Sequence, residues 1–299
     1  MPHPFTQQPC KPQEYLVSGW VLAGDRCPKP LRVILRSLVL ILWTLACYAA
    51  MRAIQLATIG KPGKRKHWAK RLSRRWIRTM RGLFGIRVFG VGHIPEPPFF
   101  LVINHHTWVG YFGINDLIDA RIVIMQRAAS FPFSGMLMQG TDPIVTDRKS
   151  ENVPVINREL IATIQRKESV LIAPEGAVTP GHMIRRYHAA LLEAAVVTGS
   201  PVHYATVHWR TPEGCPPPSQ SVIYGPDPYV RDASGRLAAS ELEVWGPERP
   251  MLPHLISLLA LPHCDMVVRF GPAPIAGKDR ITLANALHAA SLDIFTPSA

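Results

Sequence analysis

The feature that most constrains the fold is a regular alternation of short apolar runs and polar blocks. Four blocks stand in order, at residues 104–108 (Asn-His-His-Thr-Trp), 146–148 (Thr-Asp-Arg), 174–176 (Pro-Glu-Gly) and 200–202 (Ser-Pro-Val). Each one follows or precedes an apolar run that predicts a buried strand. Polar clusters at strand ends are where α/β proteins usually hold their chemistry. The pattern therefore predicts a functional site built from these blocks.

From residue 85 onward, strand and helix patterns alternate, which predicts an α/β fold. We expect a mixed, largely parallel central sheet flanked by helices, in a domain spanning residues 85–299. The predicted strands are 86–91, 99–103, 121–125, 143–145, 169–173, 202–207, 221–224 and 266–270. The predicted helices are 116–120 (the end of a helix), 133–139, 155–166, 187–198, 250–261 and 279–291.

Residues 1–30 contain six prolines and little periodicity, and they predict a disordered arm. An uncharged apolar run follows at 37–50, between Arg36 and Arg52. A membrane span needs about 20 apolar residues, and this run reaches that length only by extending past Arg52 with arginines snorkelling at its ends. We favour a membrane-embedded or monotopic helix. A buried core helix is the alternative, and a cleaved signal peptide is disfavoured because about 36 residues precede the run.

The segment from 61 to 84 is strongly basic and amphipathic. It carries ten Lys or Arg and no acid up to residue 81, while Trp68, Leu72, Trp76 and Met80 recur at four-residue steps. Such a helix suits an anionic membrane surface; nucleic acid and an ordinary solvated helix face are the competing interpretations. The adjacent apolar helix favours the membrane. We therefore predict a membrane-associated helical segment at 31–84, with its basic flank on the cytoplasmic side.

Composition excludes several classes. The chain has 33 Lys and Arg against 21 Asp and Glu, and most of the excess lies in the basic segment. Its five cysteines form no C-x-x-C pair, which argues against a disulfide framework or a zinc site and fits a reducing compartment. No H-E-x-x-H, P-loop or G-x-S-x-G string is present.

The polar blocks carry groups suited to acyl or phosphate chemistry. A histidine after a strand can accept a proton from a hydroxyl near neutral pH, or can simply hydrogen-bond the backbone. Arg148 could bind an anionic head group or form a surface ion pair with an acid. Glu175 sits on a tight turn, where it could act in the site or cap the next helix.

Together these blocks resemble the glycerolipid acyltransferase family, which includes the bacterial lysophosphatidic acid acyltransferases. The resemblance runs from about residue 31 to 293. The family's motif N-H-x-S-W-x-D reads Asn104-His-His-Thr-Trp-Val-Gly110 here, and its Asp-Arg motif is matched by Asp147-Arg148. Its P-E-G motif is matched at 174–176, its Pro-Val pair at 201–202, and its Pro-x-x-Gly at 132–135.

The resemblance implies a membrane-associated O-acyltransferase. His105 would be the general base on a lysolipid hydroxyl, which attacks an acyl thioester of acyl-carrier protein or acyl-coenzyme A. Substrate binding would involve Arg148 at the head group, Glu175 and Gly176 at the acceptor site, and Asn104 and Thr107 beside the base. No metal or bound cofactor is required, and nucleic acid is not expected as a partner. The expected location is the cytoplasmic face of the inner membrane, monotopic or single-span.

Two positions depart from the family pattern. Gly110 stands where the family has the aspartate that orients the histidine, so a catalytically impaired member that binds lysolipid is the alternative function. Residues 177–178 are Ala-Val where Thr-Arg is common, which removes one basic phosphate contact and favours an acceptor other than lysophosphatidic acid, although Arg185 or Arg186 could substitute. Further stretches resemble the lyso-ornithine-lipid acyltransferase branch: residues 185–195, then Trp245-Gly246 followed by Leu252-Pro-His254 and by residues 267–272 (Val-Val-Arg-Phe-Gly-Pro).

Overall fold

The computed structural model describes residues 13–147, 150–176, 178–179, 181–215, 218 and 251–298. These residues form an eight-stranded sheet in the order β1-β2-β8-β7-β3-β6-β4-β5. The strands are β1 (Glu14–Ser18), β2 (Ile86–Val91), β3 (Phe100–Ile103), β4 (Arg121–Met125), β5 (Ile144–Thr146), β6 (Val170–Ile172), β7 (Val202–Arg210) and β8 (Cys264–Phe270). The β1–β2 and β7–β8 pairs are antiparallel and the other pairs are parallel, which confirms the mixed, largely parallel sheet.

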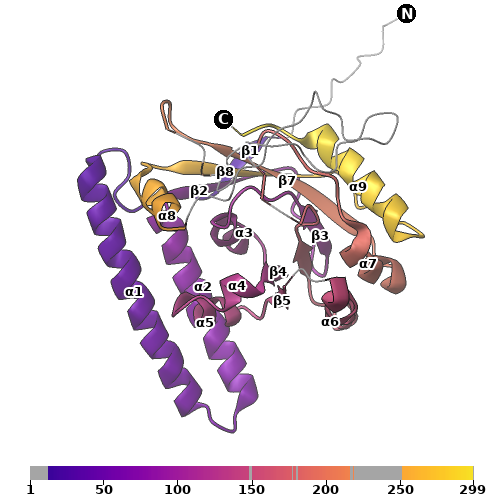
Figure 1. The fold of residues 1–299 in the computed structure, drawn as a ribbon, viewed down its shortest axis with the longest axis horizontal. Helices are drawn as coiled ribbons and strands as arrows, with labels where there is room; N and C mark the ends of the chain where they lie inside the picture. The colour runs from indigo at the N-terminus through magenta and orange to yellow at the C-terminus, as the bar shows by residue number, and fades with distance from the viewer. Residues whose placement is uncertain are drawn as a thin grey trace, which may run out of the picture.

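Helices cover both faces of the sheet (Figure 1). They are α1 (Lys29–Ala57), α2 (Pro62–Leu83), α3 (Gly110–Leu117), α4 (Gln126–Ala129), α5 (Ser134–Gln139), α6 (Val153–Gln165), α7 (Glu193–Thr198), α8 (Met251–Ala260) and α9 (Arg280–Ile294). Leu101 and Ile103 of β3 belong to the apolar core shared with α1, α2, α3 and α8, whereas Phe100 and Val102 belong to the core shared with α6, α7 and α9. This alternation follows from the two-residue repeat of a strand.

Part of the N-terminal arm is ordered, which differs from the expectation for residues 1–30. Strand β1 pairs with β2, and the Tyr15 ring lies so close over Gly90 that a Cβ at Gly90 would stand 2.5 Å from it. The Trp20 ring covers Gly82 and stacks 5.6 Å from the Arg81 guanidinium. The absence of a side chain at Gly90 and Gly82 thus leaves room for the rings of Tyr15 and Trp20, respectively. The rest of that prediction, residues 1–12, lies outside the described residues.

Helix α1 is fixed to the rest of the protein at its N-terminal end. The Arg36 guanidinium donates to the carbonyls of Leu259, Leu261 and Pro262 at distances of 3.2, 2.6 and 3.0 Å. Arg32 donates to Ala260 O at 2.6 Å. Carbonyls at the end of a helix lack intrahelical partners, so these two cations satisfy the end of α8. The arginines before the apolar run are therefore buried, and the expectation that they snorkel to a membrane surface is wrong.

Helix α2 turns its apolar side into the protein core. Trp76 is 2% exposed, and its Nε1 donates to Thr44 Oγ1 of α1 at 3.1 Å. Several of its cations pair with acids of the α/β domain: Lys70 and Arg74 with Asp119, Arg78 and Arg81 with Asp116, and Lys66 with Asp142. The segment 31–84 therefore shares its core with the domain that follows.

The predicted elements after residue 85 recur with small shifts at their ends. The helix expected at 187–198 is a 3₁₀ turn at Ala189–Leu192 followed by α7, and α3 ends at Leu117. The strand expected at 221–224 lies outside the described residues.

Candidate functional site

The first and third polar blocks meet at one edge of the sheet. Strands β3 and β6 are parallel neighbours in the register Val102↔Ile172, so the residues that follow them leave the sheet side by side. The loop 104–109 connects β3 to α3, and the turn 173–176 follows β6. The carboxyl edge of a parallel sheet is the expected place for a site.

The His105 backbone is held on both sides, by Glu175 of the third block and by Thr179 just after it. Its N–H donates to Glu175 Oε1 at 2.6 Å, and its carbonyl accepts from Thr179 N at 2.8 Å. The other carboxylate oxygen, Glu175 Oε2, accepts from Arg185 N at 2.8 Å. Glu175 thereby joins three segments of chain. Glu175 was predicted at the acceptor site, and in the structure it accepts a hydrogen bond from the backbone of His105, the predicted base.

Glu175 is buried completely, with 0% exposure. Burial raises the pKa of its carboxyl to about 8, while the backbone N–H groups of Arg185 and His105 and the charge of Arg185 favour the ionised form. A buried carboxyl group that accepts from two backbone donors is expensive to remove, because both donors lose their acceptor.

Asn104 and His106 form an internal network that differs from the predicted substrate contact of Asn104. The Asn104 amide pairs with the backbone of Val207, accepting from Val207 N at 2.6 Å and donating to Val207 O at 3.0 Å. It also lies 2.7 Å from His106 Nε2. An amide nitrogen can only donate, so His106 Nε2 accepts and its Nδ1, 3.4 Å from Ser298 Oγ, carries the proton. Asn104 thus ties the loop to β7.

The structure separates the roles of the two neighbouring histidines. His106 is 3% exposed, and burial together with His105, His208 and His182 lowers its pKa to about 3. With one ring nitrogen held by Asn104, His106 has little capacity to take a proton from a substrate. His105 is partly exposed, which leaves it as the better candidate for a base.

His106 should make stability depend on pH. Its pKa lies near 6.5 in an unfolded chain and at about 3 in the folded protein, so between these values only the unfolded chain binds the proton. The free energy of unfolding should therefore fall as pH drops below 6.5, by about 2.7 kcal/mol at pH 4.5 from this group. Denaturant titrations of the wild type and His106→Gln test this. Equal losses on acidification in both proteins would contradict it.

The structure places Gly176 in a tight turn and Thr107 in the protein interior. Gly176 has φ +69°, and a Cβ there would stand 3.0 Å from the His188 ring, so the turn requires glycine. Thr107 is buried, and its Oγ1 has no hydrogen-bond partner among the described residues. Contact of either residue with substrate remains a prediction.

Gly110 is the first residue of α3, and its backbone lies outside the left-handed region. A Cβ there would have Trp209 at 3.7 Å, an ordinary contact. The acids downstream are engaged elsewhere, since Asp116 pairs with Arg81 at 2.9 Å and Asp119 pairs with Lys70 at 3.1 Å. Both acids therefore serve ion pairs with α2.

The second and fourth blocks lie at opposite edges of the sheet. Asp147 follows β5 at the same edge and is exposed, with Asn152 Nδ2 donating to its Oδ2 at 2.8 Å. Arg148 lies outside the described residues, so its predicted role at the head group remains a prediction. The Pro201-Val202 pair begins β7, where Val202 pairs with Phe100 at the start of β3. This block therefore lies at the opposite edge from His105.

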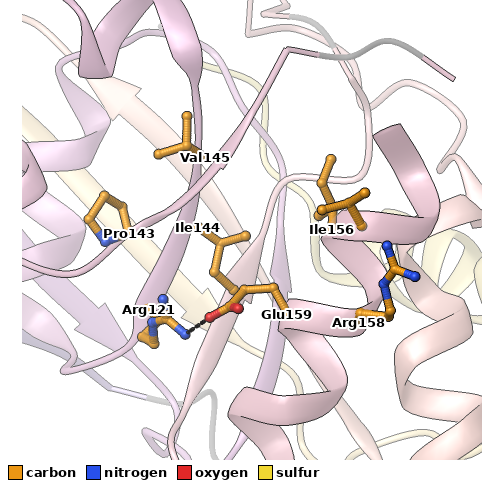
Figure 2. Close-up of a pocket in the computed structure, with 8 residues that line it drawn as sticks. Arg121, Pro143, Ile144, Val145, Ile156, Arg158 and Glu159 are labelled. Atoms are coloured by element: carbon orange, nitrogen blue, oxygen red, sulfur yellow. Dashed lines mark hydrogen bonds and ion pairs between the residues drawn. The ribbon is translucent and has the colours of Figure 1, made fainter. Parts of the chain in front are cut away.

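A cavity of about 500 Å³ lies between β5 and α6. Figure 2 shows Arg121 joined there to Glu159, with Arg158 on the α6 side. Arg121 also donates to Asp142 O at 2.8 Å and to Thr163 Oγ1 at 2.6 Å. These bonds hold the sheet edge against α6, and none of the residues that carry the site around His105 lines this cavity.

Two residues near the site, Thr179 and Ser298, were not expected from sequence, and the contact made by a third, His254, was not expected either. Thr179 acts through its backbone, which gives no side-chain signal. Ser298 Oγ accepts from Trp209 N at 2.9 Å and its N–H donates to Gly181 O at 2.7 Å, a contact of distant segments that no local pattern reveals. His254 accepts from Trp108, although the Leu-Pro-His stretch had marked it.

A protein family, several curated proteins and a solved structure are similar to this chain. Residues 85–207 match the Acyltransferase family. A lyso-ornithine lipid O-acyltransferase of Pseudomonas aeruginosa is 26% identical over 172 residues, 58% of this chain and 66% of the relative. Another, from Brucella abortus, is 24% identical over 74% of this chain and 80% of the relative. A 1-acyl-sn-glycerol-3-phosphate acyltransferase of Neisseria gonorrhoeae is 27% identical over 36% of this chain and 44% of the relative.

The matches to the Pseudomonas and Neisseria proteins therefore span less than two thirds of those relatives. Among solved structures, the 1-acyl-sn-glycerophosphate acyltransferase PlsC of Thermotoga maritima aligns with a TM-score of 0.54. It covers 89% of this chain and 98% of that protein at 13% identity, a likeness of fold.

Proposed function

Since residues 85–207 of this chain form an acyltransferase domain, we propose that the protein moves a fatty acyl group from an acyl thioester to the hydroxyl of a lysolipid. The observation that carries the proposal is His105, a partly exposed histidine whose backbone is held by Glu175 at the carboxyl edge of the sheet. A general base must reach the hydroxyl at a fixed position, and this clamp supplies the fixed position.

In the proposed reaction, His105 accepts the proton of the lysolipid hydroxyl as its oxygen attacks the thioester carbonyl. The carbon–oxygen bond forms, the carbon–sulfur bond breaks, and the thiolate leaves with the proton that His105 returns. The donor is acyl-coenzyme A or acyl-carrier protein. No metal or bound cofactor takes part in these steps.

We propose a lyso-ornithine lipid or a related lysolipid as the acceptor. Two relatives that match this chain are named lyso-ornithine lipid O-acyltransferases. In addition, Val178 stands two residues after the third block, where arginine is common in the family. Arg186 is exposed beside this block, whereas Arg185 is buried. Arg186 is thus the better placed of the two to assist Arg148 at an anionic head group.

Purified protein in detergent, with a labelled acyl donor and a panel of lysolipids, tests this proposal. We expect the lyso-ornithine lipid to give the highest kcat/KM and lysophosphatidic acid a lower one. The opposite order would overturn the acceptor assignment. Lysolipid binding without turnover on any acceptor would favour the alternative function, a catalytically impaired member that binds lysolipid.

The Gly110→Asp variant tests that alternative from the structural side. The backbone there accepts a side chain, and a carboxylate in the first turn of a helix is favourable by roughly 0.3–1 kcal/mol. We expect an unchanged or higher melting temperature and an unchanged or higher kcat, with Gly110→Asn as the uncharged control. A fall in kcat with Asp but not with Asn would show that this position does not hold an orienting carboxylate.

We also propose that the protein lies on the cytoplasmic face of the inner membrane as a monotopic protein. Helix α1 is long and apolar enough to cross a membrane. However, α2 lies along it, and each Lys or Arg taken to the bilayer centre would cost about 2.5–3.5 kcal/mol. An in-plane position avoids this cost. It buries the exposed apolar side chains of α1 and of the adjacent α8: Leu31, Ile34, Leu35, Leu38, Ile41, Leu42, Leu45, Leu252 and Ile256.

Vesicle flotation tests the in-plane position. Leu42 is 65% exposed and Leu38 is 52% exposed, and burying a leucine contributes about 1.5–3 kcal/mol. We expect Leu38→Gln/Leu42→Gln to weaken binding to vesicles containing phosphatidylglycerol by more than about tenfold. Leu292→Gln, on α9, is the control and should bind as the wild type does. Unchanged binding of the double variant would contradict the proposal.

A further inference from the structure

One contact joins the loop that carries His105 to α8, a helix outside the residues 85–207 that match the Acyltransferase family. Trp108, three residues after His105, donates from Nε1 to Nδ1 of His254 on α8 at 3.0 Å. His254 is 1% exposed. The two rings pack edge to face, with centroids 6.2 Å apart. A partly buried hydrogen bond between two ring nitrogens restricts the orientation of both rings.

The Trp108–His254 hydrogen bond determines which ring nitrogen of His254 carries the proton. Because Nδ1 accepts from the indole, the proton of a neutral imidazole lies on Nε2, which is 3.3 Å from the carbonyl of Pro218. His254 thus has a partner at each nitrogen. Few side chains could replace this geometry, but asparagine can place an amide oxygen close to the position of Nδ1.

Both ends of the contact are firmly supported. Trp108 packs edge to face against Phe84 at 5.4 Å and Phe112 at 6.0 Å between ring centroids. Helix α8 is held by Arg36 and Arg32 of α1 through its final carbonyls. The indole is therefore fixed between the apolar core and a helix that cannot easily shift.

We propose that His254 is a positioning residue for His105, acting through Trp108. The loop 104–109 is fixed at its start by the Glu175 and Thr179 bonds to His105 and by the Asn104 bonds to Val207. The Trp108–His254 bond fixes its end. With both ends held, His105 stays where a substrate hydroxyl can meet it. This inference rests on the proposed function, since it concerns the base of that reaction.

The variants His254→Phe, His254→Asn and Trp108→Phe test the role in the full-length protein. His254→Phe removes the acceptor and should lower kcat about tenfold, with the KM for lysolipid within about twofold of the wild type. Trp108→Phe removes only the donor and should lower kcat similarly, and the double variant should be no worse than either single one. His254→Asn should recover kcat to within about threefold. His93→Asn, at an exposed histidine, is the control.

Amide hydrogen exchange of residues 104–112 supplies a readout independent of turnover. We expect faster exchange in His254→Phe and in Trp108→Phe than in the wild type, with His254→Asn close to the wild type. Unchanged exchange and kcat in His254→Phe, or equal losses in His254→Asn and His254→Phe, would overturn the inference. A wild type without turnover would instead contradict the proposed function, and the exchange data would still decide the role of His254.

Discussion

The His105→Ala variant is expected to lose acyl transfer, with kcat lower by about 10²–10⁴. The histidine is partly exposed, and its neighbour His106 is buried and neutral, so no other imidazole of this loop is placed to act as the base. The steady-state rate of thioester consumption with saturating lysolipid measures this loss. Binding of the lysolipid should change little, because the base contributes chiefly to the transition state.

Folding of this variant should be close to wild type. The clamp on residue 105 uses its backbone N–H and carbonyl, which alanine retains. Thermal unfolding within a few degrees of the wild type is therefore the control. Residual activity near the wild-type level, in a folded protein, would remove His105 from the role of base.

The Glu175→Ala variant is expected to lose both stability and activity. Two backbone donors, the partly buried His105 N and the buried Arg185 N, lose their acceptors, and each unsatisfied donor costs about 1–3 kcal/mol. We expect the free energy of unfolding to fall by about 2–6 kcal/mol and kcat to fall at least about tenfold, because the His105 backbone loses one of its fixed bonds. Denaturant titration and steady-state kinetics measure the two effects.

Glu175→Gln is the matched variant. It keeps one carbonyl oxygen for one donor but presents an amide N–H₂ to the other, so it should lie between the wild type and Glu175→Ala in stability. Glu213→Gln, at an exposed turn position, should resemble the wild type. A Glu175→Ala variant as stable and as active as the wild type would contradict the clamp.

Much of the α/β domain could be predicted because its strands are short apolar runs with polar ends. The runs before Asn104 and Pro174 gave β3 and β6 within a residue or two, and the rule for parallel strands brought their ends together. The rule that brings the carboxyl ends of parallel strands together does not apply to Pro201-Val202. That block precedes its strand, and so it lies at the other edge.

Side-chain roles could be predicted less well, because they depend on distant partners. The Asn104 amide serves Val207 on a strand about one hundred residues later, and Arg36 serves the end of α8 more than two hundred residues later. A basic helix pattern also says nothing about which face meets the core. Asp116, Asp119 and Asp142 pair with cations of α2 only because the fold brings them beside it.

Transfer of a labelled acyl group to lyso-ornithine lipid, by the wild type and His105→Ala side by side, tests whether His105 is the base of acyl transfer. We expect a labelled diacylated product that requires both donor and lysolipid, with its formation lost in His105→Ala while that variant stays folded. Product formed equally by both proteins, or by neither although both bind lysolipid, would contradict His105 as the base of an acyltransferase.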